Sequence, residues 1–170
     1  DFPFLVREVV AMGRIPHGNT ALDVARIVDE VNETLGLGHL SERTYTTLSG
    51  GEKRRVQIAR VLCQIWDRLP DACLMLDEPT GPLDLAHEMV VLELLHTLTR
   101  RGLTALLVMH DINLAARCAD HIGLLHETKF EVGAPAEMIT ASSLAAAFGI
   151  AADVQIMAQA PQIRLHSERF

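Results

Sequence analysis

Residues 48–60 read LSGGEKRRVQIAR, and the rest of the chain is organised around this stretch. Ser49, Gly50 and Gly51 come directly before a run whose apolar residues recur three or four apart, which predicts one face of a helix. These apolar residues are Val56, Ala59, Cys63 and Trp66. The first N–H groups of a helix lack partners within it and the dipole there is positive, so such an end can bind an anion. An ordinary capped helix after a turn is the alternative interpretation.

A pair of acidic residues follows the next apolar run of the chain. Ala72–Leu76 predicts a short strand buried on both faces, and it ends in Asp77 and Glu78 before Pro79 breaks it. In open α/β sheets, ligands bind beyond the carboxyl ends of the strands. Two acids at such a place are costly to bury unless a cation or hydrogen bonds compensate them. A surface turn that happens to carry two acids is the alternative.

A second strand is predicted over Leu103–Met109, and His110 stands at its end. Asp84 and Asp111 are each placed to cap the helix that follows them, over residues 85–101 and 112–119. A histidine after an apolar strand is by itself more often a satisfied polar residue than a ligand. The alternation of strand and helix predicts an α/β fold, with a mainly parallel sheet flanked by helices.

Helical and hairpin segments are predicted on either side of this centre. Residues 1–13 predict a loop and a short helix with Leu5, Val9 and Met12 buried, and residues 20–35 predict a longer helix. Together they would form a small helical layer. Towards the end of the chain, residues 121–125 and 130–133 predict paired strands, followed by two short helices and two weaker strands.

Composition excludes several classes of function. The chain has 170 residues, 49% hydrophobic and 22% charged, and a formal net charge of −7, which argues against a nucleic-acid partner. No apolar run approaches the roughly 18 residues that span a bilayer. Three separated cysteines predict buried free thiols in a reducing compartment; they are Cys63, Cys73 and Cys118. The basic cluster Lys53, Arg54 and Arg55 is interpreted as a solvated face rather than a polyphosphate site.

Three motifs occur in a specific order: LSGGE, then CLMLDEPTGPLD at 73–84, then LLVMHD at 106–111. In this order the chain resembles the ATP-binding subunits of ABC transporters. RTYTTLSGGE, ARVLCQIW and LLVMHDINLAARCADHIGLLH are similar to the hemin-import ATPases of the iron-siderophore, hemin and cobalamin uptake group. The resemblance implies a partial P-loop NTPase fold. Residues 1–47 would be part of a helical subdomain that docks on the membrane permease, and residues 48–170 would be the C-terminal part of the ATPase core.

The resemblance also assigns roles to single residues. Asp77 would hold Mg²⁺, through water, and Glu78 would be the catalytic base for ATP hydrolysis. His110 would contact the γ-phosphate. The signature residues would close over ATP bound by a second subunit, paired head to tail; they are Ser49, Gly50, Gly51 and Glu52. Asp84 would be the D-loop aspartate, which reports across that dimer.

The expected protein is an energy-coupling ATPase of an importer, with hemin as the preferred cargo. It would lie on the cytoplasmic face of the bacterial inner membrane, bound to integral-membrane permease subunits and served indirectly by a periplasmic or extracellular binding protein. Two alternatives stay open. One is an ABC-type ATPase of DNA repair or chromosome maintenance, which the acidic charge and the absence of sustained heptads disfavour. The other is a catalytically silent module that only binds partners.

Some of the family's features are altered or absent in this sequence. The D-loop reads Gly81-Pro82-Leu83-Asp84, where Ser-Ala-Leu-Asp is usual, and the proline removes a donor. There is no GxxxxGK[ST], the loop that cradles the phosphates. We therefore expect the chain to be a fragment that alone neither binds ATP tightly nor hydrolyses it. An exposed apolar face and poor solubility should accompany the absent strands.

Overall fold

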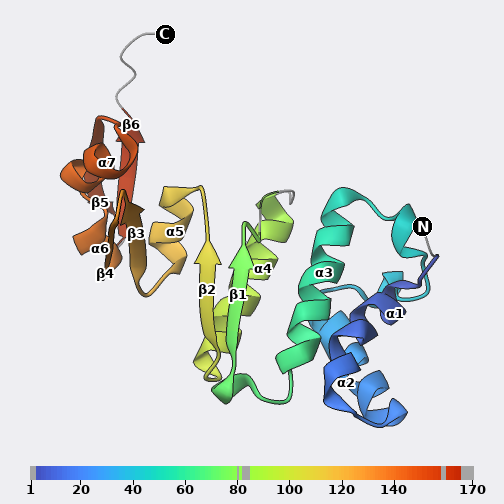
Figure 1. Ribbon diagram of the computed structural model, residues 1–170. Coiled ribbons are helices and arrows are strands. Elements are labelled where there is room, and N and C mark those ends of the chain that lie inside the picture. Colours follow the sequence, from blue (N-terminus) through green and yellow to red (C-terminus); the bar gives the residue numbers. More distant parts are fainter. Residues whose placement is uncertain (1–2, 80, 82–84, 158–159, 166–170) are drawn as a thin grey trace. The chain divides into compact units, whose positions relative to one another are not determined.

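The computed structural model describes residues 3–79, 81, 85–157 and 160–165, which form two compact units, residues 1–108 and 109–170 (Figure 1). The first unit contains α1 (Val6–Ala11), the 3₁₀ helix η1 (Met12–His17), α2 (Ala21–Thr34), α3 (Gly50–Ile65), β1 (Cys73–Asp77), α4 (Leu85–Arg100) and β2 (Thr104–Val108). The second contains α5 (Ile112–Cys118), β3 (Ile122–His126), β4 (Lys129–Gly133), α6 (Pro135–Met138), α7 (Ala141–Phe148), β5 (Ala152–Met157) and β6 (Ala160–Leu165). The boundary after residue 47, which would separate a helical subdomain from the ATPase core, stays a prediction.

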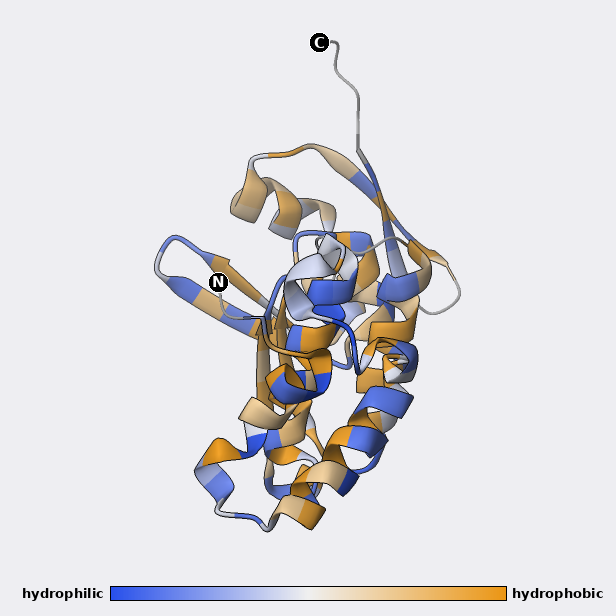
Figure 2. Cartoon of the chain, turned by 90° about the vertical axis from the view of Figure 1, so that its right-hand side faces the viewer, coloured by the Kyte–Doolittle hydropathy of each residue, from blue (hydrophilic) through white to orange (hydrophobic). Residues whose placement is uncertain are grey.

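The helices α1 and α2 contact each other, as the predicted helical layer requires, and both pack against α3. Hydrophobic and hydrophilic residues alternate around the helices in Figure 2, and the hydrophobic ones supply the core. Val56, Ala59 and Cys63 of α3 are completely buried, which confirms the predicted face. The predicted face of α1 is confirmed at Val9, whereas Leu5 and Met12 are only half-buried. The other buried residues of the helix are Val6 and Val10, and Leu5 stands before the helix as its cap.

The strands β1 and β2 form a parallel pair in which Cys73 faces Thr104 and Asp77 faces Val108. The α/β class is thereby confirmed. One face of the pair packs on α4, through Leu74 on the strand and the buried leucines of the helix, Leu94, Leu95 and Leu98. The prediction that the strands are buried on both faces is wrong for the described residues. Only one face meets a helix, and the other exposes Met75, Leu106 and Val108, which bears out the expected apolar face.

The second unit is built on two antiparallel hairpins. β3 pairs with β4 across a turn at Glu127 and Thr128, close to the predicted position, and β5 pairs with β6. The side chain of Asn113 in α5 bonds both the N–H and the carbonyl oxygen of Ile163, at 2.7 and 3.4 Å, which ties the helix to β6. The core of this unit consists of Ala116, Ile122, Ile139, Leu144 and Ala152.

The cysteines correct one prediction. All three are free thiols, but only Cys63 is buried. Cys73 lies on the exposed face of β1, because side chains alternate along a strand and Leu74 takes the buried side. Cys118 is exposed in the last turn of α5. Within the described parts of the chain, no helix combines the length and the apolar character needed to cross a membrane.

Candidate functional site

The N-terminus of α3 is closed by a reciprocal cap. The Glu52 N–H donates to Ser49 Oγ at 3.3 Å, and the Ser49 N–H donates to Glu52 Oε2 at 2.7 Å. This is the capping box that a serine followed three residues later by a glutamate predicts. The backbone hydrogen bond from Ser49 is the largest cause that lowers the pKa of the Glu52 carboxyl. Ser49 and Glu52 therefore hold the start of the helix rigidly.

The glycine turn at this helix end has open space beside it. A Cβ added to Gly50 would meet no atom within 4 Å, so packing inside the described chain does not call for glycine there. Gly50 and its neighbour Gly51 are the first two residues of α3, where the N–H groups have no acceptor within the helix. A group from outside the chain can approach the backbone closely at such a place, and an anion suits it best.

The two predicted acids lie at the carboxyl end of β1. Asp77 is the last residue of the strand, and both acids are exposed. The Glu78 N–H extends the ladder by donating to the carbonyl oxygen of Val108 at 3.0 Å. Glu78 then turns the chain with a φ of 45°, in the left-handed region. A residue other than glycine gives up about 1–2 kcal/mol there, so its surroundings must enforce the turn.

Arg54 of α3 supplies part of that enforcement. Its Nη2 donates to the carbonyl oxygens of Asp77 and Glu78, both at 2.6 Å, and its Nε donates to that of Pro79 at 3.3 Å. The prediction of a solvated basic face is therefore wrong for Arg54. It is also wrong for Arg55, which is only 9% exposed, because this side of α3 packs against the first unit.

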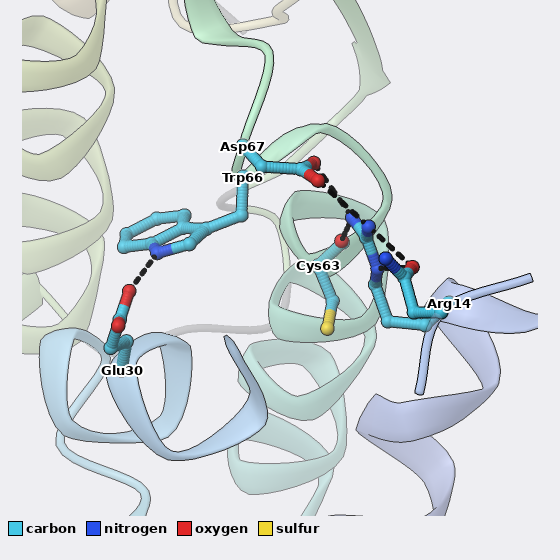
Figure 3. A network of polar contacts seen from close by, with 6 residues as sticks. Arg14, Glu30, Cys63, Trp66 and Asp67 are labelled. Atoms are coloured by element: carbon cyan, nitrogen blue, oxygen red, sulfur yellow. Dashed lines mark hydrogen bonds and ion pairs between the residues drawn. The ribbon is translucent and has the colours of Figure 1, made fainter. Parts of the chain in front are cut away.

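A second polar cluster holds the other end of α3 (Figure 3). Arg14 of η1 donates to both carboxylate oxygens of Asp67 at 2.9 Å and to the carbonyl oxygen of Cys63 at 2.9 Å. It also donates to Asn19 Oδ1. The hydrogen bonds that Arg14 donates to the Asp67 carboxylate are the largest cause that lowers the pKa of this carboxyl. Burial raises the pKa of the Cys63 thiol to about 11, so this thiol stays protonated at neutral pH.

Trp66, directly after α3, joins the helix to α2. Its indole Nε1 donates to Glu30 Oε2 at 2.8 Å, and Glu30 also accepts from Arg26. The hydrogen bond from Trp66 is the largest cause that lowers the pKa of the Glu30 carboxyl. The guanidinium of Arg101 lies 5.8 Å from the centre of the indole ring. The helix is thus fixed at both ends, by its cap and Arg54 at one and by Arg14 and Trp66 at the other.

The remaining predicted site residues belong to the second unit or lie outside the described residues. His110 is exposed and belongs to the second unit, which is described separately from the acids of the first, so its role stays a prediction. Asp111 caps α5 as predicted, since its Oδ1 accepts from the Leu114 N–H at 2.9 Å. Asp84, predicted both as a helix cap and as the D-loop aspartate, lies outside the described residues, as do Pro82 and Leu83.

The first unit thus brings two predicted features together through Arg54, a residue that its sequence context had indicated to be solvated. The exposed Asp77 carboxylate is the hard oxygen ligand that Mg²⁺ prefers. The carboxylate of Glu78, one residue on, can accept a proton from a bound water. Arg54 connects both to the helix that begins at Ser49. Arg14 was missed and Arg54 was interpreted as solvated, because no local pattern separates an arginine that crosses to another element from a solvated one.

Comparisons with known proteins identify relatives of the chain. The family model described as "ABC transporter" matches residues 3–81. The hemin import ATP-binding protein of Plesiomonas shigelloides is 39% identical over 180 residues, which cover 98% of this chain and 68% of the relative. That of Pseudomonas entomophila is 42% identical, covering 91% of this chain, and the chain spans 61% of its length.

Solved structures share the fold. A metal-chelate-type ABC transporter in an inward-facing conformation matches with a TM-score of 0.82 and 27% identity, over 98% of this chain and 69% of that one. A Clostridium perfringens subunit of the ABC transporter complex cbiONQ matches with a TM-score of 0.68 and 27% identity, over 84% of this chain and 56% of that one.

Proposed function

The chain belongs to the ABC transporter family, and we propose that the whole protein is the ATP-hydrolysing, energy-coupling subunit of an importer. The observation that carries the proposal is the strand end at Asp77 and Glu78, bound through Arg54 to the helix that begins with the serine–glycine turn. Hydrolysis of ATP needs a metal ion, an oriented water and stabilised phosphate charge. This part of the first unit offers a residue for each of the first two needs and an anion-binding helix end for the third.

Each residue has a proposed part in the reaction. The carboxylate of Asp77 would hold Mg²⁺ through a water molecule, and the ion would offset the charge of the phosphates. The carboxylate of Glu78 orients the attacking water and accepts its proton. Ser49, Gly50 and Gly51 meet the phosphates of ATP held by a second, head-to-tail subunit, and Glu52 keeps the serine in place. We also propose that His110 contacts the γ-phosphate and that Asp84 lies in the D-loop.

Replacing Glu78 with glutamine tests the proposal. The amide keeps the shape of the side chain but cannot accept the proton, so ATP turnover should fall on the order of 10²-fold or more. Binding of ATP should persist, and the variant should accumulate as an ATP-bound dimer that size-exclusion chromatography detects. Glu93→Gln, at an exposed position of α4, is the matched control and should behave as the parent does. Unchanged turnover in Glu78→Gln would remove the base from its proposed role.

We propose hemin as the cargo, because relatives that are 39–42% identical bear the name of hemin import proteins. The partners would be integral-membrane permease subunits, with the ATPase bound peripherally at the cytoplasmic face of the inner membrane and a binding protein acting indirectly. Deleting the gene should abolish growth on hemin as the only iron source, and the intact gene but not its Glu78→Gln form should restore it. Loss of growth on a ferric siderophore or of cobalamin uptake, with growth on hemin intact, would reassign the cargo.

We propose further that these 170 residues alone do not turn over ATP. They contain no GxxxxGK[ST], the loop whose backbone and lysine hold the β- and γ-phosphates. Isothermal titration calorimetry of the chain with MgATP should therefore detect no tight binding. A dissociation constant on the order of 1 μM, which corresponds to about −8 kcal/mol, would contradict this expectation.

A further inference from the structure

We propose that Arg54 is a positioning residue, which holds Glu78 in the orientation that its reaction requires. The inference rests on the role proposed above for Glu78. The backbone contacts of the Arg54 guanidinium group would keep the Glu78 carboxylate in a fixed orientation. None of these contacts involves the carboxylate itself, so Arg54 would act through the backbone.

Three consecutive carbonyl oxygens converge on the side chain of Arg54. The carbonyl oxygens of Asp77, Glu78 and Pro79 lie 2.6, 2.6 and 3.3 Å from nitrogen atoms of Arg54. Neighbouring carbonyl groups in a strand point in alternating directions, so this convergence exists only because the chain turns at Glu78, where φ is 45°. A cation is the natural partner of several carbonyl dipoles that point at one place, because it offsets their mutual repulsion.

Two peptide groups flank the Cα atom of Glu78. Together they determine the direction of its Cα–Cβ bond, since φ and ψ are rotations relative to these planes. The group before Glu78 is held on both sides. Its carbonyl, from Asp77, bonds Arg54, and its N–H, from Glu78, bonds the Val108 carbonyl of β2 at 3.0 Å.

The peptide group after Glu78 can be held from one side only. Its nitrogen belongs to Pro79, which has no N–H to donate. Its carbonyl, from Glu78, therefore has to carry the whole restraint. It accepts from Arg54 at 2.6 Å and from the Gly81 N–H at 3.3 Å. Arg54 donates to the carbonyl oxygens of both peptide groups. Loss of its side chain should therefore release the peptide group after Glu78 more than the one before it.

Arginine suits this position better than lysine would. A guanidinium presents several N–H donors in a rigid, planar fork, whereas the ammonium of lysine is a compact point charge on a flexible stem. Lysine at this position can reach one or two of the carbonyl oxygens but cannot hold all three at fixed angles. Arg54 also belongs to the same helix as Ser49. A helix moves as a rigid body. If the N-terminus of α3 shifted towards the nucleotide of a partner subunit, Arg54 would move with it and displace the backbone around Glu78.

The test uses the full-length subunit assembled with its permease. Arg54→Met should lower kcat for ATP about 10- to 100-fold, because a small misplacement of a reacting group costs that much. KM for ATP should change by less than about threefold, since the signature turn is left intact. The variant should also accumulate the ATP-bound dimer, as Glu78→Gln is expected to do. Arg54→Lys should give an intermediate kcat. Arg60→Met, on the same helix, is the matched control and should leave kcat unchanged.

The outcomes separate positioning from other roles. A normal kcat in Arg54→Met, or a raised KM with loss of the ATP-bound dimer, would overturn the proposal, the second by showing a role in nucleotide binding. If Arg54→Met melts at a lower temperature than the parent, the same readouts on Arg54→Lys decide the matter. Should Glu78→Gln keep its turnover, the proposed function itself fails. Should Glu78→Gln lose turnover while both Arg54 variants keep theirs, only the positioning role fails.

Discussion

Arg14 and Asp67 form a two-point ion pair, with Nη1–Oδ1 and Nη2–Oδ2 both at 2.9 Å. The Arg14 side chain is 2% exposed and that of Asp67 39%, so the pair lies at the edge of the core. The planar guanidinium matches the carboxylate in this geometry, which a lysine cannot reproduce. The pair joins residues that are 53 positions apart and fixes the end of α3 to η1.

Replacing Asp67 with asparagine should therefore destabilise the first unit. The substitution removes a charge-assisted pair of hydrogen bonds and leaves the buried guanidinium of Arg14 with the Cys63 carbonyl and Asn19 as partners. We expect the free energy of unfolding to fall by about 2 kcal/mol, measured from the urea midpoint of the transition. Arg14→Lys should cost a similar amount, because lysine offers no fork.

The exposed ion pair between Arg7 and Glu42 provides the matched control. Its side chains are 50% and 68% exposed, so water already solvates both charges. Arg7→Met should change the free energy of unfolding by less than about 1 kcal/mol. Equal effects of Arg7→Met and Asp67→Asn would show that burial of Arg14 adds nothing to the interaction with Asp67.

The chain should lose stability in acid. Arg14 holds the pKa of the Asp67 carboxyl below its ordinary 3.8, and Trp66 holds that of Glu30 below its ordinary 4.5. Hydrogen bonds with Ser49 likewise lower the pKa of the Glu52 carboxyl. The unfolded chain then binds more protons than the folded one below these ordinary values. The stabilisation is complete above about pH 4.5 and is lost as the pH falls through the lowered pKa of each group.

Urea unfolding measured between pH 6 and pH 3 tests this expectation. The urea midpoint of the parent should decrease as the pH is lowered from 6 to 3. The midpoint of Asp67→Asn should decrease less, because asparagine cannot take up the proton. A parallel loss in parent and variant would mean that Asp67 contributes nothing to the acid sensitivity. Cys63 does not titrate in this range, since its pKa is about 11.

Gly13 of η1 lies close against the backbone of α3. A Cβ added there would lie 2.1 Å from the carbonyl oxygen of Arg60, which is backbone and cannot rotate away. Gly13→Ala should force η1 and α3 apart and lower the free energy of unfolding by about 1–3 kcal/mol. Gly38→Ala is the control, since nothing lies within 4 Å of the added carbon. Similar melting temperatures of the two variants would contradict the tight approach.

Local patterns predicted much of this fold. The apolar run before Asp77 became β1, the run before His110 became β2, and the two pair in parallel as the alternation of elements indicated. Ser49 and Asp111 cap their helices. Each of these features depends on residues only a few positions apart, where hydrophobic spacing and capping chemistry are readable directly.

The contacts that hold the candidate site could not be predicted in the same way. Arg54 reaches 23 to 25 residues along the chain to the end of β1, and Arg14 reaches 49 to 53 residues to the end of α3. Periodicity reports which face of an element is apolar, but not which element that face will meet. The exposure of Cys73 and Met75 was missed for the same reason, because burial on both faces of a strand depends on what covers each of them.

Substitution of Gly50 should impair the proposed binding of nucleotide while leaving the stability of the fold nearly unchanged. The chain leaves open space beside Gly50, so Gly50→Ala should change the free energy of unfolding by less than about 1 kcal/mol. In the full-length subunit, the added methyl group would stand where the phosphates of the partner's ATP must approach the backbone. Introduced into the Glu78→Gln variant, Gly50→Ala should abolish the ATP-bound dimer in size-exclusion chromatography, whereas Gly38→Ala should preserve it. A dimer that forms normally with Gly50→Ala would show that no nucleotide docks on this helix end, whatever Glu78 does.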